Sequence, residues 1–324
     1  MFINSTVILF YSNMLLGVVL SLSSNNWMML WIGLEISLMC FIPLMISNLM
    51  ISSECSMKYF IVQSMSSSIF ILGVIFMLMG VSMNYEMIII LSMVMKMGVA
   101  PFHTWVLSII EGLNYTATFN LFTIMKMVPM MVIMKMNLNL NLIIILTLIV
   151  GSLFGLNQNS IRKILAYSSI FNMGFMIYST KNLSLWLLYF LIYTVSLLML
   201  IVILNLNNIN YLNQLLINKI ELKNKLSIWI LMLSAGGMPP MLGFMGKLIV
   251  IELAINFEDW FISLMMIITS LLTMFFYNRL CFIIMSVSSS MTKWKINSMS
   301  WLSLNIMIIN LMVMPILILV KYLN

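Results

Sequence analysis

Apolar segments of membrane-spanning length recur from one end of this chain to the other, and they limit the possible folds more than any other feature of the sequence. About 20 consecutive apolar residues are needed for a helix to cross the hydrocarbon core of a bilayer. Only 7% of the 324 residues are charged, whereas soluble domains carry about 25%. A soluble globular protein is therefore excluded, and the sequence predicts an all-α, polytopic membrane protein.

We expect about eleven transmembrane helices joined by mostly short loops. Their approximate ranges are 2–22, 26–46, 58–80, 87–107, 116–135, 140–158, 161–180, 183–205, 226–253, 259–284 and 300–322. The first segment has no Lys or Arg before it and no small-residue cleavage site, so we interpret it as a retained span. The longer loop from Leu206 to Lys225 is either an amphipathic helix on the membrane surface or an irregular, asparagine-rich loop.

The positive charges of the loops predict the orientation of the chain in the membrane. We call the side that holds the N-terminus side A and the opposite side side B. Side A receives Lys58, Arg162, Lys163, Lys219, Lys223, Lys225, Arg279, Lys293 and Lys295, and side B receives Lys135, Lys181 and Lys321. Because positively charged loops remain in the inner compartment, side A is expected to be the inner side, with the N-terminus inside and the C-terminus outside.

Two of the expected spans, the fourth and the ninth, contain helix-breaking residues. The breaks are Ala100-Pro101 and Gly236-Gly237-Met238-Pro239-Pro240. Each broken span is the fourth in a run of five, which predicts inverted five-helix repeats at about 2–135 and 140–284, followed by a C-terminal helix at about 300–322. Broken segments at matching positions point to a transport site at the repeat interface, but Gly and Pro are common in membrane helices, so coincidence is the alternative.

Four ionisable side chains lie inside apolar spans: Glu35, Lys96, Lys126 and Lys247. A charged side chain near the bilayer centre costs roughly 2.5–3.5 kcal/mol on insertion scales. Snorkelling to the interface explains Lys247 equally well, and a structural Glu–Lys ion pair would account for one lysine but not for the other two. Burial disfavours the charged form of an amine, whereas a nearby carboxylate favours it, so these residues predict a proton relay.

The only histidine, His103, stands two residues after Pro101. It is either a hydrogen-bonded packing residue or a further proton carrier. One histidine without an acidic cluster does not make a metal site. The three cysteines, Cys40, Cys55 and Cys281, lack the CxxC spacing of zinc or iron–sulfur ligands, and no nucleotide-binding motif is present. We therefore expect this chain to bind no metal, nucleotide or redox cofactor.

Five motifs, in this order, resemble the subunit 2 family of mitochondrial NADH:ubiquinone oxidoreductase (complex I), whose members are antiporter-like membrane subunits. They are Gly33-Leu34-Glu35, Lys96 through His103, Lys126-Met127-Val128-Pro129, Ala166-Tyr167-Ser168-Ser169-Ile170, and Gly236 through Lys247. The 38 methionines are typical of translation from an AT-rich animal mitochondrial genome. The resemblance covers essentially the whole chain.

The resemblance implies roles for the buried charges. Glu35 would pair with Lys96, Lys126 would be the central relay, and Lys247 would be the distal group of a polar axis. The chain would be a multi-pass subunit of a proton-translocating NADH:ubiquinone reductase in the mitochondrial inner membrane, with its N-terminus in the matrix. Its partners would be other membrane-arm subunits and membrane lipids. NADH, FMN, iron–sulfur clusters and ubiquinone would belong to partner subunits, since this chain has no redox site.

Two rival functions and two departures from the family pattern stand beside this interpretation. The rivals are a cation/proton antiporter subunit without redox partners and a membrane scaffold that transports nothing.

The departures are Asn172, where family members often carry a His, and Gly246, where a Pro is common before Lys247. Asn172 cannot titrate, so a proton route through this position needs water or other groups.

Overall fold

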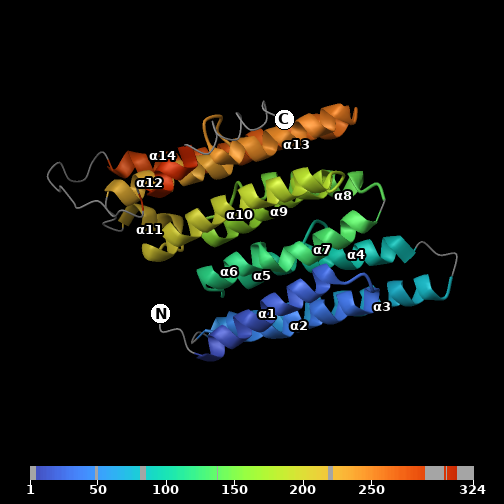
Figure 1. Ribbon diagram of the computed structural model, residues 1–324. Helices are drawn as coiled ribbons and strands as arrows, with labels where there is room; N and C mark the ends of the chain where they lie inside the picture. Colours follow the sequence, from blue (N-terminus) through green and yellow to red (C-terminus); the bar gives the residue numbers. More distant parts are fainter. Residues whose placement is uncertain are drawn as a thin grey trace. The chain divides into compact units, whose positions relative to one another are not determined.

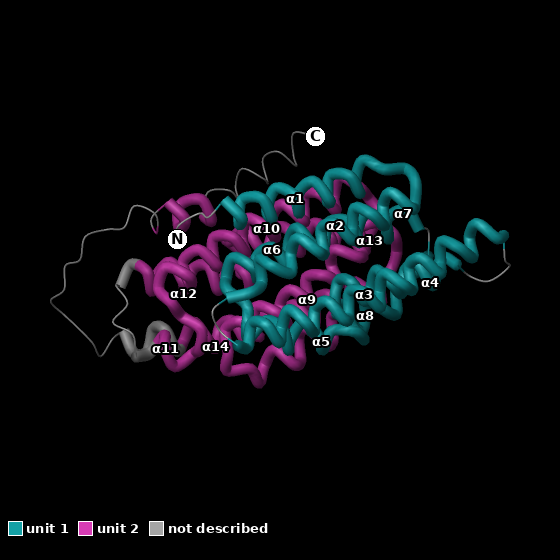
Figure 2. The backbone as a smooth tube through the Cα atoms, turned by 90° about the horizontal axis from the view of Figure 1, so that it is seen from below, with its two compact units in different colours: residues 1–147 teal, residues 148–324 magenta. Residues whose placement is uncertain are grey.

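The computed structural model describes residues 5–47, 50–80, 85–136, 138–217, 222–288, 303 and 305–311. Within these ranges the regular structure is helical, and the only β contact is an isolated bridge between Ser160 and Tyr211. The chain divides into two compact units, unit 1 (residues 1–147) and unit 2 (residues 148–324), which are teal and magenta in Figure 2.

Six helices of the described part are long and apolar enough to cross a membrane. This observation confirms the predicted all-α membrane fold. The count of eleven spans and the arrangement in inverted repeats stay predictions, and residues 312–322 of the expected last span lie outside the described part.

The described residues of unit 1 form seven helices and the first part of an eighth. They are α1 (Ser5–Ser23), α2 (Trp27–Met45), α3 (Met50–Leu78), α4 (Tyr85–Met97), α5 (Thr104–Ile110), α6 (Tyr115–Phe122), α7 (Ile124–Lys135) and α8 (Asn141–Leu153). Figure 1 shows α1, α2 and α3 side by side, and α2 packs against both of its neighbours.

Small residues bring α1 and α2 into close contact. A Cβ atom added to Gly33 would lie 2.6 Å from the carbonyl oxygen of Gly17 and 2.9 Å from the backbone nitrogen of Ser21. Ser21 and Ser37 stand one turn after the two glycines, so each helix presents a small-xxx-small pair to the other. Such pairs let membrane helices pack closely through van der Waals contact. The contact fixes the helix that carries Glu35.

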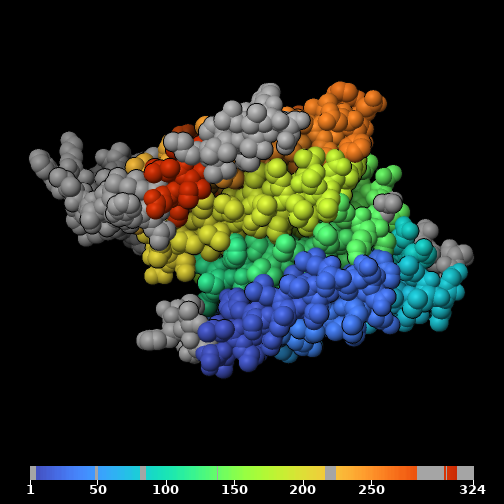
Figure 3. Space-filling model, in the orientation of Figure 1, coloured from blue at the N-terminus to red at the C-terminus, as the bar shows by residue number. Residues whose placement is uncertain are grey.

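The outer face of unit 1 is apolar. In Figure 3 the blue N-terminal helices form the surface of this unit on the side shown. Their exposed side chains include Leu16 (57%), Val19 (59%) and Met29 (56%). Since lipid tails impose no penalty on exposed apolar side chains, this surface is suited to the hydrocarbon core of a bilayer.

The third predicted span begins earlier than the sequence suggested. We expected it at residue 58, but α3 begins at Met50. The polar residues between these positions resemble a loop, yet they form a helical extension that is buried on one side, at Ser52 and Ser56. On its exposed side Lys58 Nζ lies 2.7 Å from Glu54 Oε1. An acidic and a basic residue four positions apart stabilise a helix in this order.

The described part of unit 2 contains the end of α8, a short helical stretch at 305–311 and six helices with assigned bounds. They are α9 (Ile161–Ser179), α10 (Leu183–Leu206), α11 (Leu212–Ile217), α12 (Leu222–Gly236), α13 (Leu242–Asn256) and α14 (Trp260–Ser288). The short α11 is a helix within the loop from Leu206 to Lys225, whose residues 218–221 lie outside the described part. Almost every side chain of α9 is buried, so this helix forms the centre of the unit.

The break in the fourth span is confirmed, and its geometry is that of a helix C-cap. After α4 ends at Met97, Gly98 adopts a left-handed φ of +66°. The Gly98 N–H donates to the Met95 carbonyl at 3.1 Å, and the Val99 N–H donates to the Val94 carbonyl at 3.2 Å. These two hydrogen bonds define a Schellman motif, which needs a residue that tolerates positive φ.

The break in the ninth span is also confirmed and repeats this geometry. Gly237 follows α12 with φ +88°. Its N–H donates to the Ser234 carbonyl at 3.0 Å, and the Met238 N–H donates to the Leu233 carbonyl at 3.2 Å. A proline stands three residues after the left-handed glycine in both breaks, as Pro101 and as Pro240. This local equivalence supports the predicted repeat.

The fifth span is interrupted close to Lys126. Pro129 lies inside the continuous helix α7. The interruption falls at Thr123, between α6 and α7, where φ is −114° and ψ is −78°. The Thr123 hydroxyl donates to the Phe119 carbonyl at 2.7 Å. A threonine side chain that bonds the preceding turn disturbs a helix, which explains the position of the interruption.

Candidate functional site

Lys96 and Lys126 line one cavity inside unit 1. Lys96 belongs to the last turn of α4 and Lys126 to the first turn of α7, and their exposed fractions are 7% and 3%. The cavity has a volume of about 20 Å³, which is enough for one water molecule. Its lining residues are Leu34, Ser37, Leu38, Tyr59, Gln63, Lys96, Met97, Trp105, Leu121, Met125, Lys126 and Pro129. The structure thus brings together two of the four predicted relay residues.

Two side chains satisfy the last carbonyl groups of α4, which have no partner within the helix. Gln63 Nε2 donates to the Lys96 carbonyl at 3.1 Å, and Trp105 Nε1 donates to the Met95 carbonyl at 3.2 Å. Gln63 is only 5% exposed. Gln63 was not among the predicted site residues, although a lone amide within the apolar stretch of α3 was a usable signal. It holds in place the helix end that carries Lys96.

The ammonium group of Lys126 lies over an aromatic ring. The distance from Lys126 Nζ to the centre of the Phe122 ring is 5.1 Å. The face of an aromatic ring attracts a cation within about 6 Å. Phe122 is the last residue of α6, so the interruption at Thr123 positions the ring beneath the amine.

Glu35 acts on Lys96 from α2 without forming an ion pair. Its Oε1 atom is buried and has no hydrogen-bond partner among the described residues. The carboxylate interacts electrostatically with both Lys96 and Tyr59. Its neighbours Leu34 and Ser37 line the lysine cavity, but Glu35 does not. The Glu35–Lys96 pair therefore stays a prediction.

His103 lies apart from the lysines. Its ring is half-buried, and its Nδ1 atom lies 3.2 Å from the Pro101 carbonyl oxygen. It lines neither the cavity of Lys96 nor the one around Lys247. This placement favours a packing role over a relay role for His103.

Lys247 reaches back from α13 to the break that precedes it. Its Nζ atom donates a hydrogen bond of 2.7 Å to the Gly236 carbonyl, the last carbonyl of α12. Nζ also lies 3.5 Å from Thr273 Oγ1 and 5.2 Å from the centre of the Phe171 ring. With 6% of its surface exposed, Lys247 is buried in unit 2, and these contacts argue against snorkelling.

Glycines make room for this side chain. A Cβ atom on Gly237 would lie 2.9 Å from Lys247 Nζ and 3.1 Å from Lys247 Cδ. Gly246 packs against the ring of Tyr189, with 3.1 Å between an added Cβ and Tyr189 Cδ2. Any side chain at Gly237 would therefore push the amine away from Gly236.

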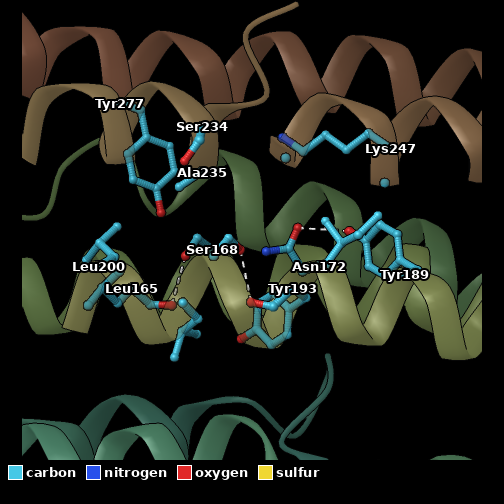
Figure 4. Close-up of a pocket in the computed structure, with 15 residues that line it drawn as sticks. Leu165, Ser168, Asn172, Tyr189, Tyr193, Leu200, Ser234, Ala235, Lys247 and Tyr277 are labelled. Atoms are coloured by element: carbon cyan, nitrogen blue, oxygen red, sulfur yellow. Dashed lines mark hydrogen bonds between the residues drawn. The ribbon is translucent and has the colours of Figure 1, made fainter. Parts of the chain in front are cut away.

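Lys247 lines a second cavity, whose surface is mostly apolar but which several polar side chains reach (Figure 4). Its volume is about 40 Å³. The polar lining residues are Ser168, Asn172, Tyr189, Tyr193, Ser196, Ser234, Lys247 and Tyr277. The Tyr189 hydroxyl donates to Asn172 Oδ1 at 3.1 Å. The three tyrosines were not predicted, because aromatic residues are common in membrane helices and nothing in the sequence places them together.

A family profile and individual relatives both match this chain over most of its length. The profile of the family described as NADH:quinone oxidoreductase/Mrp antiporter, TM, matches residues 24–273. NADH-ubiquinone oxidoreductase chain 2 of Anopheles gambiae is 36% identical over 316 residues, which cover 91% of this chain and 92% of the relative. The protein of the same name from Branchiostoma floridae is 33% identical, with 94% of each chain covered.

Two solved structures share the fold. A chain of respiratory complex I from Thermus thermophilus superposes with a TM-score of 0.81 at 20% identity, covering 94% of this chain and 76% of its own length. A chain of the Mrp complex from Dietzia sp. gives a TM-score of 0.77 at 16% identity, covering 84% of this chain and 59% of its own length. At sequence identities of 20% and 16%, the similarity shows only that the fold is shared.

Proposed function

Because the chain belongs to the NADH:quinone oxidoreductase/Mrp antiporter membrane family, we propose that it is a proton-translocating membrane-arm subunit of complex I. NADH oxidation and ubiquinone reduction take place in partner subunits, which carry the FMN, the iron–sulfur clusters and the quinone site. This chain contributes the movement of protons and holds no redox centre.

One observation carries the proposal: Lys96 and Lys126 share a water-sized cavity inside unit 1. Two amines in one cavity repel each other when both are charged, so a proton on one favours the neutral form of the other. A carboxylate close to one amine then decides which of them holds the proton. Glu35 interacts electrostatically with Lys96, so its charge can determine which of the two lysines holds the proton.

The relay proposed here has three steps. A charge change near Glu35, caused by quinone reduction elsewhere, weakens the electrostatic attraction between Glu35 and Lys96. Lys96 then passes its proton to Lys126 by way of cavity water, and Lys247 is the distal acceptor. Moving one charge against the membrane potential costs about 2.3 kcal/mol per 100 mV, and the redox reaction supplies this energy by coupling.

The same proposal gives the chain a location. It lies in the mitochondrial inner membrane with side A facing the matrix, among other membrane-arm subunits and lipids. The excess of Lys and Arg on side A supports this orientation.

A cation/proton antiporter without redox partners is the second candidate, because the family includes Mrp antiporters. Sealed vesicles that contain the assembled complex separate the two functions. We expect NADH to drive proton uptake or release, and inhibition of NADH oxidation to abolish it. Proton exchange driven by a sodium gradient in the absence of NADH would contradict the proposal and support the antiporter.

A further inference from the structure

Two buried polar atoms of α2 have no hydrogen-bond partner among the described residues. They are the indole nitrogen Nε1 of Trp31 and the carboxylate oxygen Oε1 of Glu35. The two atoms are complementary, because an indole N–H can only donate a hydrogen bond and an ionised carboxylate can only accept one. Buried polar groups are hydrogen-bonded in the great majority of cases, so a partner that joins these two atoms is expected.

Both side chains lie on one face of α2. Trp31 and Glu35 are four residues apart, which makes them neighbours on the surface of a helix. Side chains of a helix lean toward its N-terminus, so the side chain of Glu35 leans back over the turn that carries Trp31. The indole N–H is therefore the donor of α2 that the carboxylate reaches most directly.

The same face of α2 leads to the cavity of Lys96 and Lys126. Leu38, three residues after Glu35, lines this cavity, whereas Glu35 does not. Glu35 interacts electrostatically with Lys96 and with Tyr59, and both of these side chains are lining residues. The carboxylate thus lies beside the cavity but outside it, and rotation about its side-chain bonds would carry it from the turn of Trp31 toward the lysine.

We propose that Trp31 is a positioning residue that holds the carboxylate of Glu35 away from Lys96. One water molecule accepts the hydrogen bond of the Trp31 N–H and donates one to Glu35 Oε1, so both atoms are satisfied. When the carboxylate moves to Lys96, this bridge breaks. The indole and the ammonium group therefore compete for one carboxylate, which explains why Glu35 acts on Lys96 without forming an ion pair.

This inference rests on the proposed function and deepens it, because it names the group that draws Glu35 away from Lys96. Release of the carboxylate lowers the attraction that keeps the proton on Lys96. Trp31 touches neither lysine cavity, so it acts on the relay only through Glu35. Its effect should therefore appear in the rate of turnover and not in the binding of NADH or ubiquinone.

Trp31→Phe in the assembled complex tests the positioning role. Phenylalanine keeps an aromatic ring at this position and removes the N–H donor. Without a competitor the carboxylate stays with Lys96, which then retains its proton. NADH-driven turnover should fall roughly five-fold, while the KM values for NADH and ubiquinone stay unchanged.

Two further variants separate the N–H donor from the bulk of the ring. Trp31→His restores a ring N–H and should recover most of the turnover. Trp27→Phe is the matched control, because Trp27 stands one turn earlier on α2 and packs against Phe70, with ring centres 6.3 Å apart. It should turn over at the normal rate. A Trp31→Phe complex as active as the unaltered one, or a Trp31→His complex as slow as Trp31→Phe, would overturn the proposal.

A second measurement needs no variant and decides the matter if Trp31→Phe does not assemble. A structure of the unaltered complex that resolves water should show one molecule within hydrogen-bond distance of both Trp31 Nε1 and Glu35 Oε1. Separate partners for the two atoms would overturn the positioning role. This result does not depend on turnover, so failure of the positioning role is distinct from failure of the proposed function, which is tested by proton transport.

Discussion

The amine of Lys247 donates a hydrogen bond of 2.7 Å to the carbonyl of Gly236, so a side chain of α13 closes the end of α12. The C-terminus of a helix carries a partial negative charge, which favours a cation there. The break in the ninth span is therefore part of the site, because it exposes the carbonyl that holds the lysine.

Replacing Gly237 by Ala should displace this lysine. The added Cβ would lie 2.9 Å from Lys247 Nζ, and φ at this position is +88°. We expect proton transport per NADH oxidised to fall several-fold while the complex still assembles. Proton release and NADH oxidation measured on the same vesicles report the ratio.

Gly80→Ala is the matched control for this variant. Gly80 also has a left-handed φ, +61°, but nothing lies within 4 Å of an added Cβ. Alanine at position 80 must adopt the same unfavourable left-handed backbone conformation, which costs roughly 1–2 kcal/mol. It does not crowd a lysine side chain. If both variants lose transport equally, backbone strain rather than displacement of Lys247 is the cause.

Glu35→Gln should abolish turnover and leave assembly intact. The substitution keeps the shape of the side chain and removes the charge that acts on Lys96. NADH oxidation rates and the amount of intact complex on native gels measure the two effects. Glu54→Gln serves as the control, because the Glu54 side chain is 65% exposed and pairs only with Lys58 at the surface. Loss of assembly in Glu35→Gln would instead identify a structural ion pair.

An ion pair ties two turns of unit 2 together and should contribute little to stability. Lys181 Nζ lies 2.6 Å from Asp259 Oδ2 in the turn between α13 and α14, and the Tyr178 hydroxyl donates to the same oxygen at 2.7 Å. The hydrogen bonds from Lys181 and from Tyr178 hold the pKa of Asp259 below its ordinary value of 3.8. Both side chains are about one-third exposed, at 34% and 28%.

The sign of the pH effect follows from the lowered pKa. A carboxyl with a depressed pKa in the folded state stabilises the fold above its unfolded pKa and loses this contribution as the pH falls through the folded value. A double-mutant cycle of Lys181→Met and Asp259→Asn, followed by thermal denaturation of the complex, should give at most about 1 kcal/mol. The value should be constant between about pH 6 and pH 9. A coupling energy between Lys181 and Asp259 that disappears between about pH 6 and pH 9 would contradict the lowered pKa of Asp259.

The sequence predicted local features well because their causes are local. Glycine and proline close together favour the end of a helix, so the breaks predicted at Ala100-Pro101 and at Gly236 through Pro240 are confirmed, with left-handed Gly98 and Gly237 as the residues that follow α4 and α12. Burial of Lys96 and Lys126 also followed from their apolar neighbours.

Features that depend on contacts between distant residues were missed. The bond from Gln63 to the Lys96 carbonyl joins residues 33 positions apart, and no period in the sequence indicates it. Tyr277 meets the cavity of Lys247 only because α14 packs against α12 and α13. The start of α3 was misplaced because its polar first turns resemble a loop in the sequence, whereas in the fold Ser52 and Ser56 are buried against other residues.

The most direct test of the account is the number of protons moved per NADH oxidised after replacement of Lys126 by Met. Lys126 is 3% exposed on the shared cavity, and Lys135, at the exposed end of the same helix, provides the control Lys135→Met. We predict that Lys126→Met assembles but pumps fewer protons per NADH, while Lys135→Met pumps at the normal ratio. Full stoichiometry in an assembled Lys126→Met complex would contradict the relay.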